Sequence, residues 1–340
     1  MKRDIKSMLL PELEEYFVST GEKPYRAKQI FRWLHRGAES FGCMTDLSEA
    51  LRDKLCCAFY ITAPEIAGKQ VSKQDGTIKY LWRMADGAAI ESVVMKYDRW
   101  NTVCISTQAG CAMGCAFCAS AIGGLERNLT PSEMLDQVLF SQIDSGLKIS
   151  NVVLMGIGEP LDNFDNVMQF LQLVSHPAGR NIGARHITVS TCGIIENIDK
   201  LAAYSIQLTV TASLHAPDDE TRNRLMPINN TNGVDALIDA CNRYFAKTGR
   251  RISYEYALID GVNDTAYHAG LLADKLGNSG NHVNIILLND VPERKFDASS
   301  RENTKAFIGI LAEKGVNYTI RRKLGDDIDA SCGQLRRRRV

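Results

Sequence analysis

The 340-residue sequence has no long apolar run and no excess of charge of either sign. Lys and Arg total 40, Asp and Glu total 40, and hydrophobic residues make up 45% of the chain. A composition of this kind is typical of a folded globular protein and excludes a disordered or fibrous one. No segment approaches the roughly 20 apolar residues that cross a bilayer, and the first residues are not followed by a signal-peptide core. We therefore expect a cytoplasmic protein with no membrane partner.

Cysteine stands out against this ordinary background, because the chain contains ten of them. Disulfide frameworks are rare in a reducing compartment. Cysteines that cluster in such a protein are better candidates for metal binding, redox chemistry or catalysis.

The order of the expected elements predicts an α/β fold. Residues 11–20, 25–35 and 47–59 have helical spacing, and the alternating runs 77–82 and 90–95 suit a small antiparallel sheet. From about Asn101 a strand–loop–helix rhythm repeats six times. The expected strands are residues 103–106, 152–155, 187–190, 208–212, 252–257 and 283–288. Right-handed crossovers would close them into a full or partial barrel.

We divide the chain accordingly into three parts. Residues 1–96 would form an N-terminal α+β accessory domain, residues 97–322 a partial (β/α)6-type barrel, and residues 323–340 a C-terminal loop with a basic tail.

Three cysteines, Cys111, Cys115 and Cys118, follow the first barrel strand with the spacing CxxxCxxC. Thiolates are the usual ligands of iron–sulfur clusters, and three of them leave one iron of a four-iron cluster open to another ligand. A structural zinc site needs four closed ligands, and no fourth Cys or His stands at finger spacing nearby. A zinc-containing RNA-binding module and three unliganded buried thiols are the alternatives. The spacing favours a [4Fe-4S] cluster.

The cysteine loop and its flanks resemble the RlmN/Cfr family of radical S-adenosylmethionine (SAM) RNA adenine methyltransferases. The likeness covers nearly the whole chain, including residues 24–30, 104–120 and 327–335. Residues 112–114 and 158–163 look more like the RlmN branch, which methylates C2 of adenine, than the Cfr branch, which methylates C8. The resemblance implies a [4Fe-4S] cluster on the three cysteines, SAM, and a low-potential electron donor such as flavodoxin or ferredoxin.

Residues at the strand ends match the family's SAM pocket. In a parallel barrel the carboxyl ends of all strands open on one face, where chemistry is assembled. Taken singly, each of these residues would be an ordinary turn or cap residue. The resemblance assigns the SAM pocket to Gly158, Glu159, Ser190, Ser213, Leu214, His215 and Asn289.

Two further cysteines and one glutamate lie in matching strings. Strand alternation sends the side chain of Cys104 to the face opposite Val103, and Cys332 lies where we expect a mobile loop. Alone, the two thiols would be small buried hydrophobes and Glu91 an outward-facing strand residue. The resemblance implies that Cys332 becomes S-methylated and that Cys104 resolves the RNA adduct through a transient disulfide with it. It implies that Glu91 is the proton acceptor.

Basic residues lie on both sides of Cys332, at 321–323 and 336–339. Such clusters attract phosphate, although a solvated tail is the alternative. The resemblance implies two RNA partners, 23S rRNA at the peptidyl-transferase region and tRNA beside the anticodon, with the accessory domain contacting RNA. The target adenine must leave its stack to reach a buried thiol. A radical SAM enzyme acting on a protein or small molecule is the rival within the superfamily.

Overall fold

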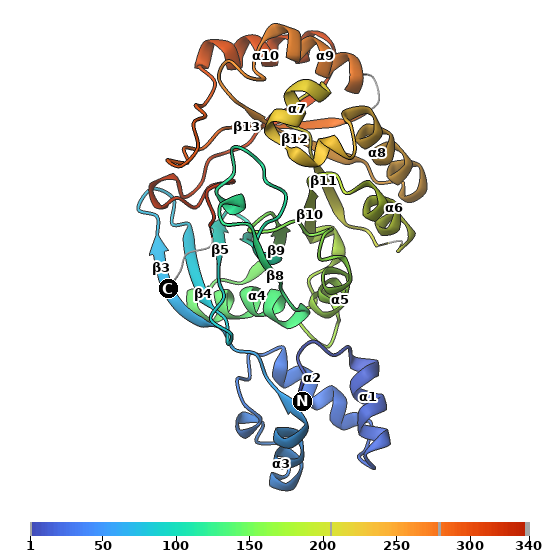
Figure 1. Ribbon diagram of the computed structural model, residues 1–340. Helices are drawn as coiled ribbons and strands as arrows, with labels where there is room; N and C mark the ends of the chain where they lie inside the picture. Colours follow the sequence, from blue (N-terminus) through green and yellow to red (C-terminus); the bar gives the residue numbers. More distant parts are fainter. Residues whose placement is uncertain (1, 205, 278–279, 337–340) are drawn as a thin grey trace.

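The structure is a computed structural model that describes residues 2–204, 206–277 and 280–336. Its N-terminal part contains helices α1 (Leu10–Ser19), α2 (Tyr25–Leu34) and α3 (Glu49–Ala58), with a short parallel pair formed by β1 (Arg3–Asp4) and β2 (Phe59–Tyr60). These helices lie at the end of the molecule opposite α9 and α10 (Figure 1). All three lie close to the ranges expected from helical periodicity.

A ten-stranded sheet forms the body of the molecule, in the order β14-β13-β12-β11-β10-β9-β6-β5-β4-β3. Its parallel strands are β6 (Asn101–Cys104), β9 (Ile149–Leu154), β10 (Ile187–Thr191), β11 (Thr209–Ser213), β12 (Ile252–Leu258), β13 (His282–Leu287) and β14 (Asn317–Ile320). The six expected strands are all present, and β14 is an additional edge strand. The α/β fold with a partial barrel is confirmed.

The antiparallel part of the sheet consists of β3 (Glu65–Val71), β4 (Ile78–Arg83) and β5 (Ala89–Lys96). We expected a separate small sheet here. Instead, β5 pairs with β6, with Val93 opposite Cys104 and Lys96 opposite Asn101, so the three strands extend the barrel sheet. The boundary expected between residues 96 and 97 therefore lies in the short connection between two paired strands.

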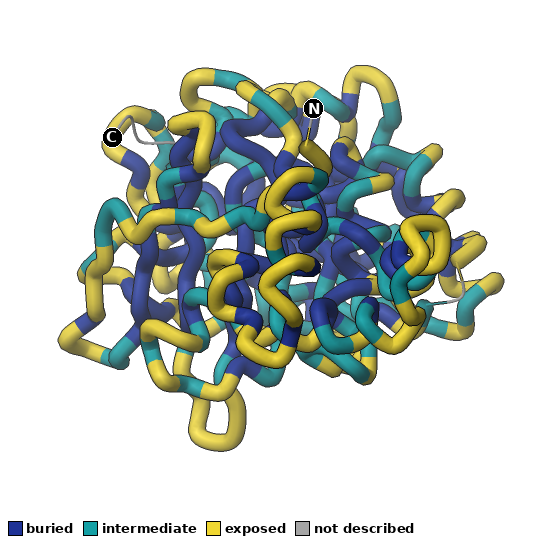
Figure 2. The backbone as a smooth tube through the Cα atoms, turned by 90° about the horizontal axis from the view of Figure 1, so that it is seen from below, coloured by how far each residue is buried: buried dark blue, intermediate teal, exposed yellow. Residues whose placement is uncertain are grey.

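Helices follow the parallel strands. They are α4 (Pro131–Ser145), α5 (Phe164–Ser175), α6 (Ile195–Ala203), α7 (Asp219–Leu225), α8 (Val234–Thr248), α9 (Ala266–Leu276) and α10 (Arg301–Glu313). Figure 2 shows buried segments in the interior of the molecule and exposed segments around its outside. No helix in the described ranges has the length and apolar character needed to span a membrane.

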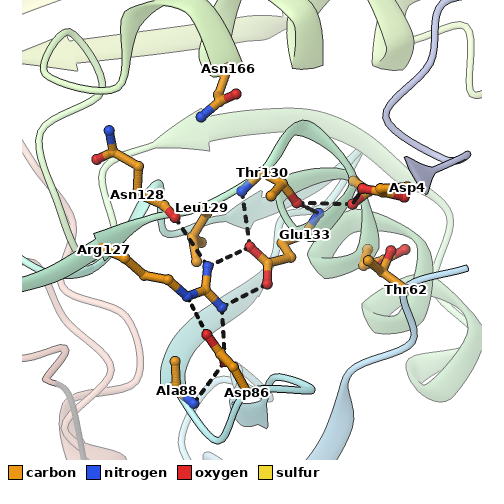
Figure 3. A network of polar contacts seen from close by, with 12 residues as sticks. Asp4, Thr62, Asp86, Ala88, Arg127, Asn128, Leu129, Thr130, Glu133 and Asn166 are labelled. Carbon is orange, nitrogen blue, oxygen red and sulfur yellow. Dashed lines mark hydrogen bonds and ion pairs between the residues drawn. The ribbon is translucent and has the colours of Figure 1, made fainter. Parts of the chain in front are cut away.

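Two polar networks join the parts of the chain. The small antiparallel pair β7 (Gln108–Gly110) and β8 (Leu125–Asn128) carries Arg127, whose guanidinium bridges Asp86 in the β4–β5 turn and Glu133 at the start of α4 (Figure 3). In the second network, Lys6 Nζ lies 2.7 Å from Asp136 Oδ1, and both side chains are fully buried. The N-terminal segment is thereby fixed to α4.

Candidate active site

The carboxyl ends of β9 to β13 surround one pocket, which we call the cofactor pocket. Six of the seven residues expected to bind SAM line it: Gly158, Glu159, Ser190, Ser213, His215 and Asn289. Leu214 is the exception, because its side chain is fully buried in the hydrophobic core and only its neighbours reach the pocket. The backbone N–H of Leu214 donates to the carbonyl of Glu255 on the next strand at 3.0 Å.

Cys111, Cys115 and Cys118 line the same pocket. Their loop is held by backbone hydrogen bonds, including one of 3.1 Å from Cys111 N to Gly124 O. Burial raises the pKa of Cys111 to about 11, and burial together with the other two thiols raises the pKa of Cys115 further above its usual range. Burial therefore disfavours the thiolate form of Cys111 and Cys115, and a bound metal centre would favour it.

The arrangement of these donors fits a cluster. Among the side chains that the structure describes, no three His, Cys, Asp or Glu residues converge as ligands of a single metal ion must. In an iron–sulfur cluster each thiolate binds a different iron, so the thiols surround a shared volume without meeting at one point. Three thiols around one pocket satisfy that requirement.

Two glycines allow the loop after β9 to approach the loop after β6. A side chain at Gly156 would place its Cβ 2.6 Å from the carbonyl oxygen of Ile105. Gly158 has a φ of +104°, and its Cβ would lie 2.6 Å from Cβ of Gln108. Both positions therefore require glycine, because neither has space for a side chain. Gly158 also requires it for its left-handed backbone.

This approach fixes Glu159 in the cofactor pocket. Its Oε1 accepts from Leu161 N at 2.9 Å and its Oε2 from Cys192 N at 2.7 Å, while burial raises its pKa. The side chains of Cys192 and Thr191 also hydrogen-bond to this carboxylate, which has about four lone-pair sites. Glu159 can therefore accept from a ligand's ammonium group in exchange for one of these side-chain contacts.

His215 is a neutral donor at the pocket wall. Its Nδ1 accepts from Ala257 N at 3.0 Å, which leaves the ring proton on Nε2. Burial and the nearby charge of Arg222 lower its pKa to about 3. His215 also has a φ of +56°, a left-handed backbone that few non-glycine residues adopt.

Asn289 carries an acceptor without a partner. Its Nδ2 donates to the carbonyl of Cys332 at 2.9 Å, whereas its buried Oδ1 has no hydrogen-bond partner in the described parts of the chain. Buried polar atoms are normally paired, so an orphan on a pocket wall points to a ligand donor. The amino groups of SAM are donors of this kind, and the pocket residues fit that cofactor.

A second pocket, which we call the thiol pocket, adjoins the first. It is lined by both Cys104 and Cys332, and all ten cysteines are free thiols. Cys104 points away from the main core, in which Val103 is buried, as strand alternation predicts. The two pockets share Met155, Ile286, Asn289, Arg321 and Cys332. Cys332 therefore stands at the junction of the two pockets.

The segment that carries Cys332 is hydrogen-bonded to the body of the protein. The carbonyl of Gly333 accepts from Ala119 N at 2.8 Å, and that of Leu335 accepts from Ser120 Oγ at 2.6 Å. We expected a mobile loop from its small and polar residues, whereas the structure shows a segment hydrogen-bonded to the cysteine loop at residues 119 and 120. The expected basic tail at 337–339 lies outside the described residues.

Glu91 is buried on β5 and does not face outward. Its Oε2 accepts from Arg336 N at 2.9 Å, and its Oε1 lies 3.9 Å from Lys79 Nζ. Glu91 shares a strand face with Val93 and Met95, which line the thiol pocket, but it lines neither pocket itself. The C-terminal segment covers its carboxylate.

Sequence reasoning missed the position of Arg321, which it grouped with the basic cluster at 321–323. Arg321 Nη1 lies 3.4 Å from Glu255 Oε2, and its Nη2 lies 3.3 Å from Met155 Sδ. The negative charge that Cys332, Glu255 and Cys104 can carry raises the pKa of Arg321 above its usual value. A run of basic residues does not reveal which member points inward.

Arg222 was also missed. Its guanidinium is buried and donates to the carbonyls of Cys192, Ser213 and Leu214. It thereby holds together the loops that follow β10 and β11. A single arginine in a polar helix gives no sequence signal for this role.

Comparisons with known proteins agree with this geometry. Residues 105–269 match the family model of the Radical SAM superfamily, and residues 4–61 match that of the ribosomal RNA large subunit methyltransferase N-terminal domain. A crystal structure of a radical SAM methyltransferase from Sphaerobacter thermophilus is similar with a TM-score of 0.93 and 42% identity, covering 98% of this chain and 99% of that one.

Two relatives are each named probable dual-specificity RNA methyltransferase RlmN. The protein from Clostridium tetani is 47% identical over 99% of this chain and 97% of its own length. That from Alkaliphilus oremlandii is 49% identical over 100% of this chain and 99% of its own. The chain therefore belongs to the RlmN family of radical SAM RNA methyltransferases, which act with a [4Fe-4S] cluster and SAM.

Proposed function

We propose that this protein methylates C2 of an adenosine in 23S rRNA and of an adenosine beside the tRNA anticodon, with Cys332 as methyl carrier. The observation that carries the proposal is the position of Cys332 at the junction of the cofactor pocket and the thiol pocket. A thiol placed there can receive a methyl group from one side and present it to a base on the other.

The cofactor pocket would hold the groups that the family uses. Cys111, Cys115 and Cys118 would ligate the cluster, Glu159 would accept from the ammonium of SAM, and Asn289 Oδ1 would accept a further N–H. Gly158, Ser190, Ser213 and His215 would complete the walls, and Leu214 would contribute through its backbone only. When bound, these groups supply the methyl group and the radical that activates it.

The chain's own residues carry the remaining steps. C2 of adenine has no lone pair, so it cannot attack a sulfonium methyl directly. The thiolate of Cys332 can, forming a sulfur–carbon bond as S-adenosylhomocysteine leaves. After the carbon has joined the base, the thiolate of Cys104 attacks the sulfur of Cys332. A disulfide forms, and the electron pair of the broken sulfur–carbon bond goes to the carbon, which takes a proton to become the methyl group.

Glu91 would accept the proton that leaves C2. Glu91 lies two residues before Val93, which lines the thiol pocket, and one of its carboxylate oxygens accepts a hydrogen bond from the backbone N–H of Arg336. Movement of residues 335–336 would open the way between this carboxylate and the base.

RNA would extend over the N-terminal helices. Lys28, Arg32 and Arg36 are exposed and follow one another at helical spacing along α2 and its end. Phosphate contacts of this kind position an RNA without reading its sequence. A soluble flavodoxin or ferredoxin would supply the electron.

The choice of C2 over C8 is supported by the relatives named RlmN. The term dual-specificity in those names supports two RNA classes, rRNA and tRNA. Digestion of RNA from cells with and without the gene, followed by chromatography and mass spectrometry, tests both points. The expected product is 2-methyladenosine in both RNAs, and 8-methyladenosine alone would overturn the assignment.

Two cysteine variants separate the proposed roles. Cys332→Ala should give neither product nor crosslink, whereas Cys104→Ala should be isolated with RNA attached through Cys332. Cys241→Ala, at a buried thiol on α8 that lines neither pocket, is the matched control and should behave like the wild type. Crosslinked RNA on the Cys332 variant would exclude its role as methyl carrier.

A further inference from the structure

The turn between β5 and β6 exposes two aromatic rings. Tyr97 is 36% exposed and Trp100 is 47% exposed, and their ring centroids are 5.9 Å apart at an interplanar angle of 34°. Tyr97 N donates to Trp100 O at 3.0 Å, which closes the turn and keeps the rings together.

One ring of the pair lies at the rim of the thiol pocket, and the other packs against it. Tyr97 lines that pocket together with Cys104 and Cys332. Arg322 and Lys323, both exposed, line it as well. Aromatic surface and positive charge therefore meet where the two thiols become accessible.

An adenine that reaches Cys332 must first leave its neighbours in the RNA. The bases on either side then lose a stacking partner, and an exposed aromatic ring replaces it at about 1–3 kcal/mol per base. Phosphates beside an unstacked base are met by lysine and arginine. Stacking rings beside a positively charged groove are the usual combination in sites for single-stranded RNA. Protein interfaces are depleted of lysine, so Lys323 beside the rings favours RNA over a protein partner.

We propose that Tyr97 and Trp100 form a stacking platform for the nucleotides that flank the target adenosine, with Arg322 and Lys323 binding the adjoining phosphates. The platform rests on the proposed function only in requiring RNA at the thiol pocket. It does not depend on which carbon of adenine is methylated.

The test uses the full-length protein and two hairpin RNAs. One has a single-stranded loop with a central adenosine, and the other has abasic sites in place of the two nucleotides that flank it. Filter binding at fixed salt gives the Kd for the wild type, Tyr97→Leu, Trp100→Leu and the double variant. Leucine keeps apolar surface but removes the ring. Tyr267→Leu, at an aromatic residue 67% exposed on α9, is the matched control.

The double variant should bind the intact hairpin about tenfold or more weakly, as loss of base stacking predicts. The affinity of the double variant for the abasic hairpin should equal that of the wild type. A Trp100→Phe variant, which keeps an aromatic ring, should bind the intact hairpin more tightly than Trp100→Leu. Arg322→Ala and Lys323→Ala should each lower the salt slope of binding by about one. Unchanged binding of the intact hairpin by the double variant would overturn the platform.

Tryptophan emission gives an independent reading. Trp82 is fully buried and Trp33 is half-buried with its Nε1 bound to Asp46, so RNA at the rim should quench Trp100 most. Absence of quenching by the intact hairpin would contradict stacking on Trp100.

Failure of the platform and failure of the proposed function give different results. If the methylated carbon is not C2, the product changes but the platform variants still bind the intact hairpin weakly. If only the platform is wrong, 2-methyladenosine forms and the KM for RNA is the same in the wild type and the double variant. A defect in cells with normal binding of both hairpins would indicate a protein partner and would also overturn the platform.

Discussion

Asn289 lines both pockets, and its Nδ2 donates to the carbonyl of Cys332 at 2.9 Å while its buried Oδ1 has no partner among the described residues. One amide thus holds the proposed methyl carrier and, in the proposed function, would also accept from the methyl donor.

We expect Asn289→Leu to weaken SAM binding by about tenfold, the value of one or two hydrogen bonds. It should also slow methylation of Cys332, because the carrier loses its anchor. Calorimetry measures the first effect, and mass spectrometry of the peptide containing Cys332 measures the second. Asn230→Leu, at an exposed asparagine, should change neither. Normal SAM affinity in the Asn289 variant would exclude the contact.

The reactivity of Cys104 should depend steeply on pH. Burial raises the pKa of this thiol to about 12, and the neighbouring Cys332 acts in the same direction. A raised pKa means that the thiolate is scarce at neutral pH and increases until the pH approaches that value. Iodoacetamide labelling of Cys104 in the folded protein should therefore still be accelerating at pH 10. The urea-unfolded chain is the control, since its midpoint should return to about 9.0. A plateau in the folded protein near pH 9 would contradict the burial effect.

Arg321 should make Cys104 easier to deprotonate, because its positive charge opposes the rise in the pKa of this thiol. Arg321→Met removes the cation and retains most of the apolar stem. Labelling of Cys104 at pH 9 should then be slower than in the wild type. Arg322→Met is the matched control, because Arg322 is exposed and adjoins the same pocket. Equal labelling rates in the two variants would show that Arg321 does not act on this thiol.

Cluster binding should depend on three cysteines. Anaerobic reconstitution should give about four irons and four sulfides per chain, as for a cubane cluster. Cys111→Ala, Cys115→Ala and Cys118→Ala should each lose most of this iron, whereas Cys241→Ala should retain it. Full iron and sulfide in any one of the first three would place a ligand elsewhere.

The buried ion pair of Lys6 and Asp136 should matter for stability. Removing one partner of a buried pair leaves an uncompensated charge and costs about 3–5 kcal/mol. Lys6→Met should therefore lower the free energy of unfolding by about that amount in a urea titration. Lys54→Met removes an ion pair with Glu22 at the surface and should cost less than about 1 kcal/mol. Similar midpoints for both variants would show that Asp136 finds another partner.

The sequence predicted the six barrel strands, because a buried parallel strand appears as a short apolar run that can be recognised without knowing its partners. The same patterns could not show that β5 pairs with β6, since periodicity marks each strand separately and does not say which neighbouring strand it hydrogen-bonds to. They also missed β14, a short edge strand with mostly exposed residues.

Within the site, spacing and resemblance predicted the three cysteines and six of the seven strand-end residues that line the cofactor pocket. Arg321 and Leu214 each follow directly after a strand, and the side to which their side chains point depends on where that strand ends relative to its neighbours. The sequence could not show this, because strand ends are aligned only in the assembled barrel.

The continuity of β5 with β6 has a consequence for exchange of segments between relatives. A chimera joined at residue 96 would combine three strands from one parent with seven from the other inside one sheet, and the β5–β6 contacts would have to match across the seam. A junction near residue 61 would leave all ten strands with one parent. Recombination that swaps the N-terminal helices alone, between parents that both have the Lys6–Asp136 pair, should therefore yield folded proteins more often.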